Sequence, residues 1–310
     1  MTGPAQFVIQ TGTGRIELLD ARGHLVRRIG QSPNGSLALS PNRSELAWSS
    51  WKGLVVARVS SGTPRLLLPE PRCDNNANEC LIEDAAWSPD GSQLLVSGLG
   101  PQRTHLEVVS ASTGRGRTIA VGQGFEVTGW SPNGKWMIYE VLPPSGQRIR
   151  LVMARGNGSA PRTIVRFPKA DGGATATWSP DSRKVAFTDT PNRQAFEQLH
   201  VYSLATGRVR HLASARIESN VAWSPDSRQL ALSLEYGGTE VVALTNGERR
   251  ILHAGGVPLA GSPTWTLSGL YMSGHHGIWR SADGLAKPVR LVRHIPGSFR
   301  EYLHGFEPLH

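Results

Sequence analysis

The chain has 310 residues, of which 39% are hydrophobic and 18% are charged. This composition excludes a disordered chain, and no apolar run reaches the length that a membrane-spanning helix requires. The formal net charge of +9 favours an anionic ligand, although general solubility explains it equally well. Nucleic acid is not the expected partner, because the sequence has no recognition motif and no interleaving of aromatic and basic residues.

Strand-like sequence begins close to the N-terminus, where Phe7–Gln10, Arg15–Asp20 and Leu25–Ile29 predict three strands. The six residues before them lack both the basic region and the apolar core of a signal peptide. Two interpretations stay open. Either the protein is cytoplasmic, or the chain is a folded domain from which an export signal has been removed.

The two cysteines of the chain, Cys73 and Cys80, lie in one polar segment and are separated by six residues. This spacing suits a disulfide that closes a surface loop, which is expected in an oxidising compartment, whereas in the cytosol both would be free thiols. We predict the disulfide, and with it a periplasmic or extracellular protein.

A motif of Trp, Ser, Pro and then Asp or Asn recurs along the chain. Full copies begin at Trp87, Trp130, Trp178 and Trp223, a degenerate copy at Ser40 lacks the Trp, and a last copy at Trp265 lacks the Ser-Pro. Successive copies are 42 to 48 residues apart, which is the length of one four-stranded propeller blade.

The motif has a physical reason. Proline fixes φ early in a turn, Asp or Asn closes a local hydrogen bond, and glycine takes the position with positive φ. Where Ser182 and Ser227 replace this glycine, we expect a slightly different turn. The large Trp side chains are expected to pack between blades rather than to stack on a ligand; these structural anchors are Trp87, Trp130, Trp178, Trp223 and Trp265.

The C-terminal segment 302–308 supplies a further strand, in which Phe306-Glu307-Pro308 stands where Trp-Ser-Pro would be. Pairing of this strand with the three N-terminal strands completes a seventh blade and removes open sheet edges. The prediction is an all-β, seven-bladed β-propeller that forms a single domain over residues 1–310. A six-bladed propeller with a loose N-terminal extension is the alternative.

The anchors at Trp87–Gly91, Trp178–Asp181 and Trp223–Asp226 resemble the repeats of the TolB-like β-propeller superfamily, a relative of the WD-type repeat. The resemblance covers nearly the whole chain and implies the fold. For function it implies only a range, because such propellers serve as protein-binding platforms, sensors, gates and occasional enzymes. A peptidase is excluded, since there is no Gly-x-Ser-x-Gly motif and the repeats fill the chain.

Functional residues are expected in the long loops opposite the anchor turns, because loops on a rigid scaffold carry most sites. Cationic residues from several of these loops are the binding candidates: Arg72, Arg103, His105, Arg148, Lys169, Arg193, His253, His275 and His276. The functional interpretation is an anion-binding mouth, and the alternative is ordinary solvated loop charge. No catalytic residue is predicted.

Six of the ten histidines lie between 253 and 310, and histidine is the commonest metal ligand. His253, His275 and His276 are therefore weak candidates for a divalent metal, as in oligogalacturonate lyases of the same fold; otherwise no cofactor is expected. The leading hypothesis is a monomeric, non-catalytic, extracytoplasmic module that binds a protein partner or an anionic ligand. The alternative is a metal-dependent lyase or hydrolase acting on an acidic oligosaccharide.

Overall fold

The computed structural model contains seven four-stranded antiparallel sheets within its described residues, which are the blades of a seven-bladed β-propeller. The all-β, seven-bladed prediction is confirmed, and the six-bladed alternative is wrong. In the part of the chain that is described, no helix is long and apolar enough to cross a membrane. The described residues are 7–11, 13–20, 22–32, 37–69, 82–99, 103–142, 148–167, 176–189, 197–215, 217–234, 238–252, 263–274, 277–284, 289–292 and 305–308.

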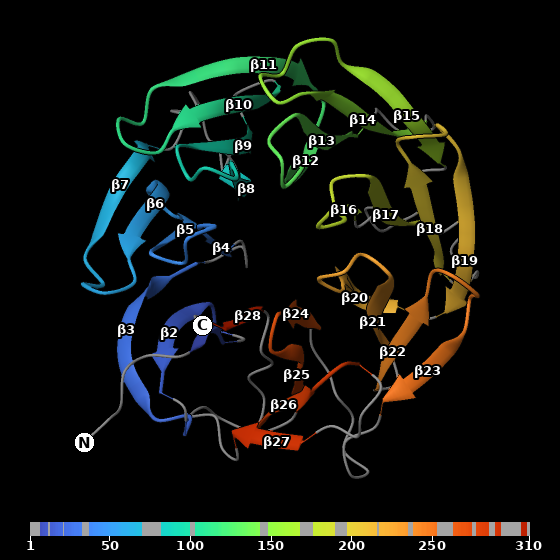
Figure 1. Ribbon diagram of the computed structural model, residues 1–310. Coiled ribbons are helices and arrows are strands. Elements are labelled where there is room, and N and C mark those ends of the chain that lie inside the picture. Colours follow the sequence, from blue (N-terminus) through green and yellow to red (C-terminus); the bar gives the residue numbers. More distant parts are fainter. Residues whose placement is uncertain are drawn as a thin grey trace. The chain divides into compact units, whose positions relative to one another are not determined.

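The chain divides into two compact units, of which one spans residues 29–173 and has three complete blades. In this three-blade unit the first strands of the blades gather on one side and the last strands on the other (Figure 1). The blades are β4 (Leu37–Leu39), β5 (Glu45–Ser50), β6 (Gly53–Arg58) and β7 (Pro64–Pro69); β8 (Ile82–Trp87), β9 (Gln93–Leu99), β10 (Thr104–Ser110) and β11 (Gly116–Gly122); and β12 (Phe125–Trp130), β13 (Trp136–Val141), β14 (Ile149–Arg155) and β15 (Arg162–Phe167).

The other unit comprises residues 1–28 and 174–310 and holds four blades. Three are contiguous in the chain: β16 (Ala176–Trp178), β17 (Lys184–Asp189), β18 (Glu197–Ser203) and β19 (Val209–Ala215); β20 (Ile217–Trp223), β21 (Gln229–Leu234), β22 (Thr239–Ala243) and β23 (Arg249–Leu252); and β24 (Thr264–Thr266), β25 (Gly269–Gly274), β26 (Gly277–Ser281) and β27 (Val289–Val292). The fourth combines β28 (Gly305–Pro308) with β1 (Phe7–Gln10), β2 (Arg15–Leu19) and β3 (Leu25–Gln31).

This fourth blade confirms the predicted closure by a C-terminal strand, since β28 pairs antiparallel with β1. The register of β28 differs by two residues from the one that the Phe306-Glu307-Pro308 motif predicts. Pro308 lies opposite Phe7, at the position where Trp87 lies opposite Leu94 in another blade. Pro308, and not Phe306, therefore has the position of the anchor Trp. The pairing of β1 with β2 sets this register, whereas the Phe306-Glu307-Pro308 motif does not predict it.

The anchor turns are closed by a serine and an acceptor two residues later. The Ser88 hydroxyl donates to Asp90 over 2.6 Å and accepts from the Gln93 amide over 2.9 Å, and Asp90 also accepts the Ser92 amide over 3.0 Å. Ser179 with Asp181 and Ser224 with Asp226 make the same bonds. The turn is thus a hydrogen-bonded unit that repeats with the blades.

The position after the acceptor has positive φ in every such turn, whether or not it is glycine. Gly91 has φ of 71°, while Ser182, Ser227 and Arg43 have 59°, 60° and 58°. The expectation of a different turn at Ser182 and Ser227 is wrong, because the hydrogen bonds of the turn hold the left-handed backbone despite the Cβ atom.

The hydrophobic core lies between neighbouring blades, and the anchor tryptophans lie in it. Trp87 belongs to a cluster shared by the blades β4–β7 and β8–β11, and its indole NH donates to the Ala38 carbonyl over 3.0 Å. Trp223 donates to the Thr177 carbonyl of the preceding blade over 3.2 Å. Trp130 and Trp178 are also buried, and Trp265 is half-buried.

A second feature recurs in the outer strands of the blades, namely a β-bulge at a Leu or Ile residue. The registers place it at Leu67, Ile119, Ile164, Leu212 and Leu291. In the first four cases an arginine lies two residues earlier, and we call these residues clamp arginines: Arg65, Arg117, Arg162 and Arg210.

The clamp arginines reach the backbone of the next blade where the described residues show their contacts. Arg117 donates to the Asn157 carbonyl over 2.8 Å and Arg210 to the Leu244 carbonyl over 2.6 Å. Arg65 donates to the Ala111 carbonyl. A charged donor thus ties each of these outer strands to its neighbour.

Candidate functional site

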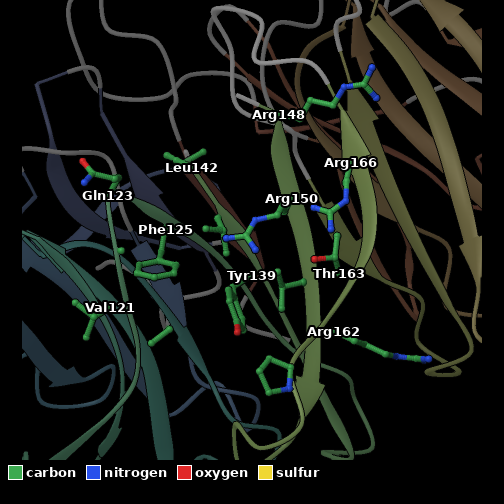
Figure 2. A pocket seen from close by; sticks show the side chains of 15 residues that line it. Val121, Gln123, Phe125, Tyr139, Leu142, Arg148, Arg150, Arg162, Thr163 and Arg166 are labelled. Carbon is green, nitrogen blue, oxygen red and sulfur yellow. The ribbon is translucent and has the colours of Figure 1, made fainter. Parts of the chain in front are cut away.

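A pocket of about 510 Å³ lies between the blades β8–β11 and β12–β15, inside the three-blade unit. The end of β11 and Gln123 form one wall, and the face of the blade β12–β15 forms the other (Figure 2). Four arginines line it: Arg148, Arg150, Arg162 and Arg166. Phe125 and Tyr139 form its buried aromatic floor, with ring centroids 6.0 Å apart in an edge-to-face contact.

The centre of the pocket is one row of residues that crosses all four strands of the blade. Phe125 lies opposite Val141, Val141 opposite Arg150, and Arg150 opposite Arg166. The last pair depends on the bulge at Ile164, since without this extra residue Val165 would lie opposite Arg150. In Figure 2 the side chain of Arg150 extends toward Phe125 and Tyr139, the head group of Arg166 lies beside Thr163, and Arg162 points away.

The charge of this row is not balanced within the described part of the chain, where no carboxylate forms an ion pair with any of the four pocket arginines. Like charges directly opposite each other destabilise a sheet by a few tenths to about 1 kcal/mol. Arg150 is half-buried, so water screens the pair incompletely. A bound anion would remove this repulsion.

Tyr139 supplies a neutral hydroxyl rather than a charge. Burial raises the pKa of its phenol above the usual value, and the nearby Arg150 opposes this only in part. The phenol therefore stays protonated at neutral pH and can donate a hydrogen bond. With the Thr163 hydroxyl and the guanidinium groups, the pocket offers several donors that suit carboxylate or phosphate oxygens.

The other blades show that this pair is not a requirement of the fold. The positions of Arg150 and Arg166 correspond to His105 and Val121 in the preceding blade, and to Gln198 and Ser214 in the blade β16–β19. Arg162, in contrast, has the position of a clamp arginine. The pair Arg150 and Arg166 is therefore the feature that is specific to this pocket.

Of the residues predicted from the sequence, the structure brings Arg148 into the pocket, at its rim and exposed. Arg103 is exposed and His105 half-buried on the neighbouring blade, and neither lines the pocket. The remaining binding and disulfide candidates lie outside the described residues: Arg72, Lys169, Arg193, His253, His275, His276, Cys73 and Cys80.

Sequence reasoning missed Arg166 because it lies within a strand, where alternating charge normally marks a solvated face. It took Arg148 rather than Arg150 from the segment before β14, because the sequence does not show which of the two faces a pocket. One signal was available. The Arg-x-Leu/Ile pattern of the outer strands gives Arg162 the place of a clamp and leaves Arg166 as a second, unexplained arginine. It does not place the bulge at Ile164 by itself, because the same pattern at Arg249–Ile251 has a regular register.

A metal centre is not assembled by the described residues, among which no group of three or more His, Cys, Asp or Glu side chains is placed to hold a metal ion. His200 is one example, since its Nε2 lies 3.1 Å from Asp189 Oδ1 and its ring contacts His211 in an edge-to-face arrangement without forming such a group. The donor set that a divalent metal requires is thus not met within these residues.

No protein-family model and no curated protein matches the chain. Among solved structures it is similar to TolB from Acinetobacter baumannii, with 17% identity and a TM-score of 0.57, over 79% of this chain and 62% of that one. It is similar to an oligogalacturonate lyase in complex with manganese, with 13% identity and a TM-score of 0.65, over 92% and 84%.

A third similar structure is a puromycin-hydrolyzing peptidase from Mycobacterium tuberculosis, with 15% identity and a TM-score of 0.70. The match covers 95% of this chain but 53% of the peptidase, and the chain spans less than two thirds of the TolB structure. At these identities the similarity concerns the fold alone, and binding proteins and enzymes share it. The chain therefore has a TolB-like β-propeller fold with seven blades.

Proposed function

We propose that this protein is a non-catalytic binding module that takes an anionic ligand in the arginine pocket of the blade β12–β15. The observation that carries the proposal is the cross-strand pair Arg150 and Arg166, which has no acidic partner among the described residues. Such a pair costs stability in the free protein, and an anion bound between the two guanidinium groups recovers it.

The lining of the pocket indicates the size and character of the ligand. A volume of about 510 Å³ accommodates a small molecule or a short chain segment. The exposed Val121 and the half-buried Leu142 add apolar surface beside the arginines. The ligand is thus an organic anion with some apolar surface, such as an acidic side chain of a protein partner or an acidic sugar.

The test replaces the two arginines by residues that the fold already carries at these positions, in the double variant Arg150→Gln with Arg166→Ser. We expect the free variant to be as stable as the parent or more stable by up to about 1 kcal/mol. Binding of trigalacturonate or of inorganic phosphate, measured by titration calorimetry, should be lost.

The matched control is Arg155→Gln, which removes an exposed arginine at the end of the same strand β14 and should bind like the parent. Affinity for the anion should fall as the salt concentration rises. If the parent binds neither of the two probes, or if the double variant binds as tightly as the parent, the proposal is wrong.

A second candidate is a metal-dependent lyase or hydrolase acting on an acidic oligosaccharide. The observation that favours it is the similarity to the manganese-bound oligogalacturonate lyase, which covers most of both chains. The basic pocket also suits the carboxylates of such a sugar. No reaction step follows from the described residues, because they do not supply the metal ligands.

Two measurements separate the candidates. Metal analysis of protein purified without a histidine tag should show a bound divalent metal for a lyase and none for a binding module. Incubation with polygalacturonate and manganese should produce the ultraviolet absorbance of an unsaturated sugar only for a lyase, and a chelator should abolish it.

The remaining proposals concern the state of the protein in the cell. We propose that it is monomeric and extracytoplasmic, with Cys73 and Cys80 joined in a disulfide. Mass spectrometry after alkylation, with and without prior reduction, measures the disulfide directly. Light scattering measures the oligomeric state, and fractionation of the native host measures the location.

A further inference from the structure

A second basic surface lies in the four-blade unit, in a groove between the blades β16–β19 and β20–β23. We call it the β19 groove. Its volume is about 570 Å³, and its lining contains four cations, Lys184, Arg208, Arg210 and Arg228, with no carboxylate. Its apolar residues are Val201, Val209 and Leu244. Val209 is 44% exposed, so part of this apolar surface faces solvent.

The same groove occurs a second time in the protein, between the blades β4–β7 and β8–β11 of the three-blade unit. The register shows the equivalence, because Arg210 lies opposite Val201 in one blade and Arg65 opposite Val56 in the other. Both arginines are clamps. The groove itself is therefore a product of the repeat and says nothing about function.

The two grooves differ in charge, and the β19 groove is the more basic. At three equivalent positions the β19 groove has Lys184, Arg208 and Arg228, where the other groove has Glu45, Thr63 and Ser92. The reverse difference occurs once, where the other groove has Arg58 and the β19 groove has Ser203, so the β19 groove stays the more basic of the two. Neither the turn nor the clamp requires these cations, since the other groove forms without them. The repeat therefore does not explain them.

Two of the three cations are available to a ligand. Arg208 and Arg228 are exposed, and no carboxylate of the described residues forms an ion pair with either. Lys184 is partly engaged, with its Nζ 3.4 Å from Asp181 Oδ2 and 5.9 Å from the centroid of the Trp223 ring. Guanidinium groups at the rim suit carboxylates, which they bind through paired hydrogen bonds.

We propose that the β19 groove is a docking site for an acidic peptide segment of a protein partner, independent of the arginine pocket. The combination of cations at the rim and valine and leucine side chains on the floor favours a segment that alternates acidic and apolar residues. A phosphate ion or a nucleic acid would leave the apolar floor unused.

The experiment uses the full chain and two fluorescein-labelled peptides, one of alternating Glu and Leu and one with Gln in place of Glu. Fluorescence anisotropy should show binding of the Glu peptide that weakens with salt, and at least about tenfold weaker binding of the Gln peptide. The variant Arg208→Thr with Arg228→Ser carries the residues of the equivalent groove and should lose about tenfold or more in affinity at an unchanged melting temperature.

The matched control is Arg115→Thr with Arg155→Ser, which removes the same net charge at exposed positions outside both grooves and should bind like the parent. The proposal is overturned if the parent does not bind the Glu peptide, if the Arg208 and Arg228 variant binds it equally well, or if a single-stranded oligonucleotide binds more tightly at the same residues. Loss of anion binding at Arg150 and Arg166 would leave these results unaffected.

Discussion

Some anchor turns have backbone strain at one residue, whereas the turns with glycine at this position do not. Arg43, Ser182 and Ser227 have left-handed backbone at a position where Gly91 and Gly134 adopt the same conformation without a Cβ atom. A non-glycine residue in this region costs about 1 kcal/mol or more. The hydrogen bonds of the serine and its acceptor outweigh this cost.

The variant Arg43→Gly should therefore raise the free energy of unfolding by about 0.5 to 1 kcal/mol. The reverse change, Gly91→Ala, should lower it by about 1 kcal/mol, because a Cβ atom there meets nothing within 4 Å and only the backbone resists. Urea denaturation measures both. Equal destabilisation by the two changes would contradict the argument.

The anchor turns should also make the free energy of unfolding depend on pH in the acidic range. The hydrogen bond from the Ser88 hydroxyl, with those from Ser92, lowers the pKa of Asp90 below its ordinary value of 3.8. A lowered folded pKa means that this contribution is complete above the ordinary value and is lost as the pH falls through the folded pKa.

Asp90→Asn tests this dependence with a residue that the turns at Asn42 and Asn133 already carry. We expect the variant to lose less stability than the parent when the pH is lowered from about 6 to below the ordinary carboxyl pKa. Urea midpoints at the two pH values measure the difference. A decrease as large as in the parent would show that Asp90 does not contribute.

Among the elements, the outer strands combine a bulge with a clamp arginine. The bulge turns a Leu or Ile toward the neighbouring blade, as Ile119 packs against the cluster around Phe125 and Trp130. The arginine two residues earlier then reaches a carbonyl of that blade. Sequence alternation alone cannot show this, because a bulge changes the face of every residue beyond it.

Arg117→Met should lower the free energy of unfolding by about 1 kcal/mol, because it keeps the apolar stem but removes the hydrogen bond to the Asn157 carbonyl. Arg115→Met is the control, since Arg115 is exposed and its hydrogen bonds with Thr113 and Ser110 are made by its backbone. Thermal denaturation compares the two. Similar effects of both changes would show that the clamp has no role.

The β-bulge also explains how much of the candidate site could be predicted from the sequence. Arg148 was found because it stands in a loop between strands, where function is expected. Arg150 and Arg166 meet only because Ile164 is an extra residue in β15, and no local pattern of this strand fixes its register by itself. The pocket is thus a product of pairing between strands.

For the whole molecule, the sequence predicted the number of blades and the closing strand, since a motif recurs every 42 to 48 residues and the three N-terminal strands lack an innermost partner. The predicted register of β28 is wrong by two residues because Phe306-Glu307-Pro308 is similar to Trp-Ser-Pro. The pairing of β1 with β2 and β28 determines the register instead. Val8 and Ile9 of β1 are fully buried. Removal of β28 would leave this strand with an open edge.

Deletion of residues 299–310 should therefore lower the melting temperature sharply and promote aggregation. A circular permutant that places the same segment before residue 1 should restore the melting temperature, because it rebuilds the four-stranded blade from contiguous chain. Differential scanning calorimetry measures both variants. An unchanged melting temperature after deletion would show that β28 does not hold the blade together.

The pairing of β28 with β1 also has a consequence for synthesis on the ribosome. β1 must wait for β28, because the other six blades of the propeller lie between them in the chain. During that time the nascent chain exposes an apolar strand edge that can pair with other chains. A chain released before Gly305–Pro308 is made would keep this edge open, and the cell's chaperones and proteases would meet it as an unfinished propeller.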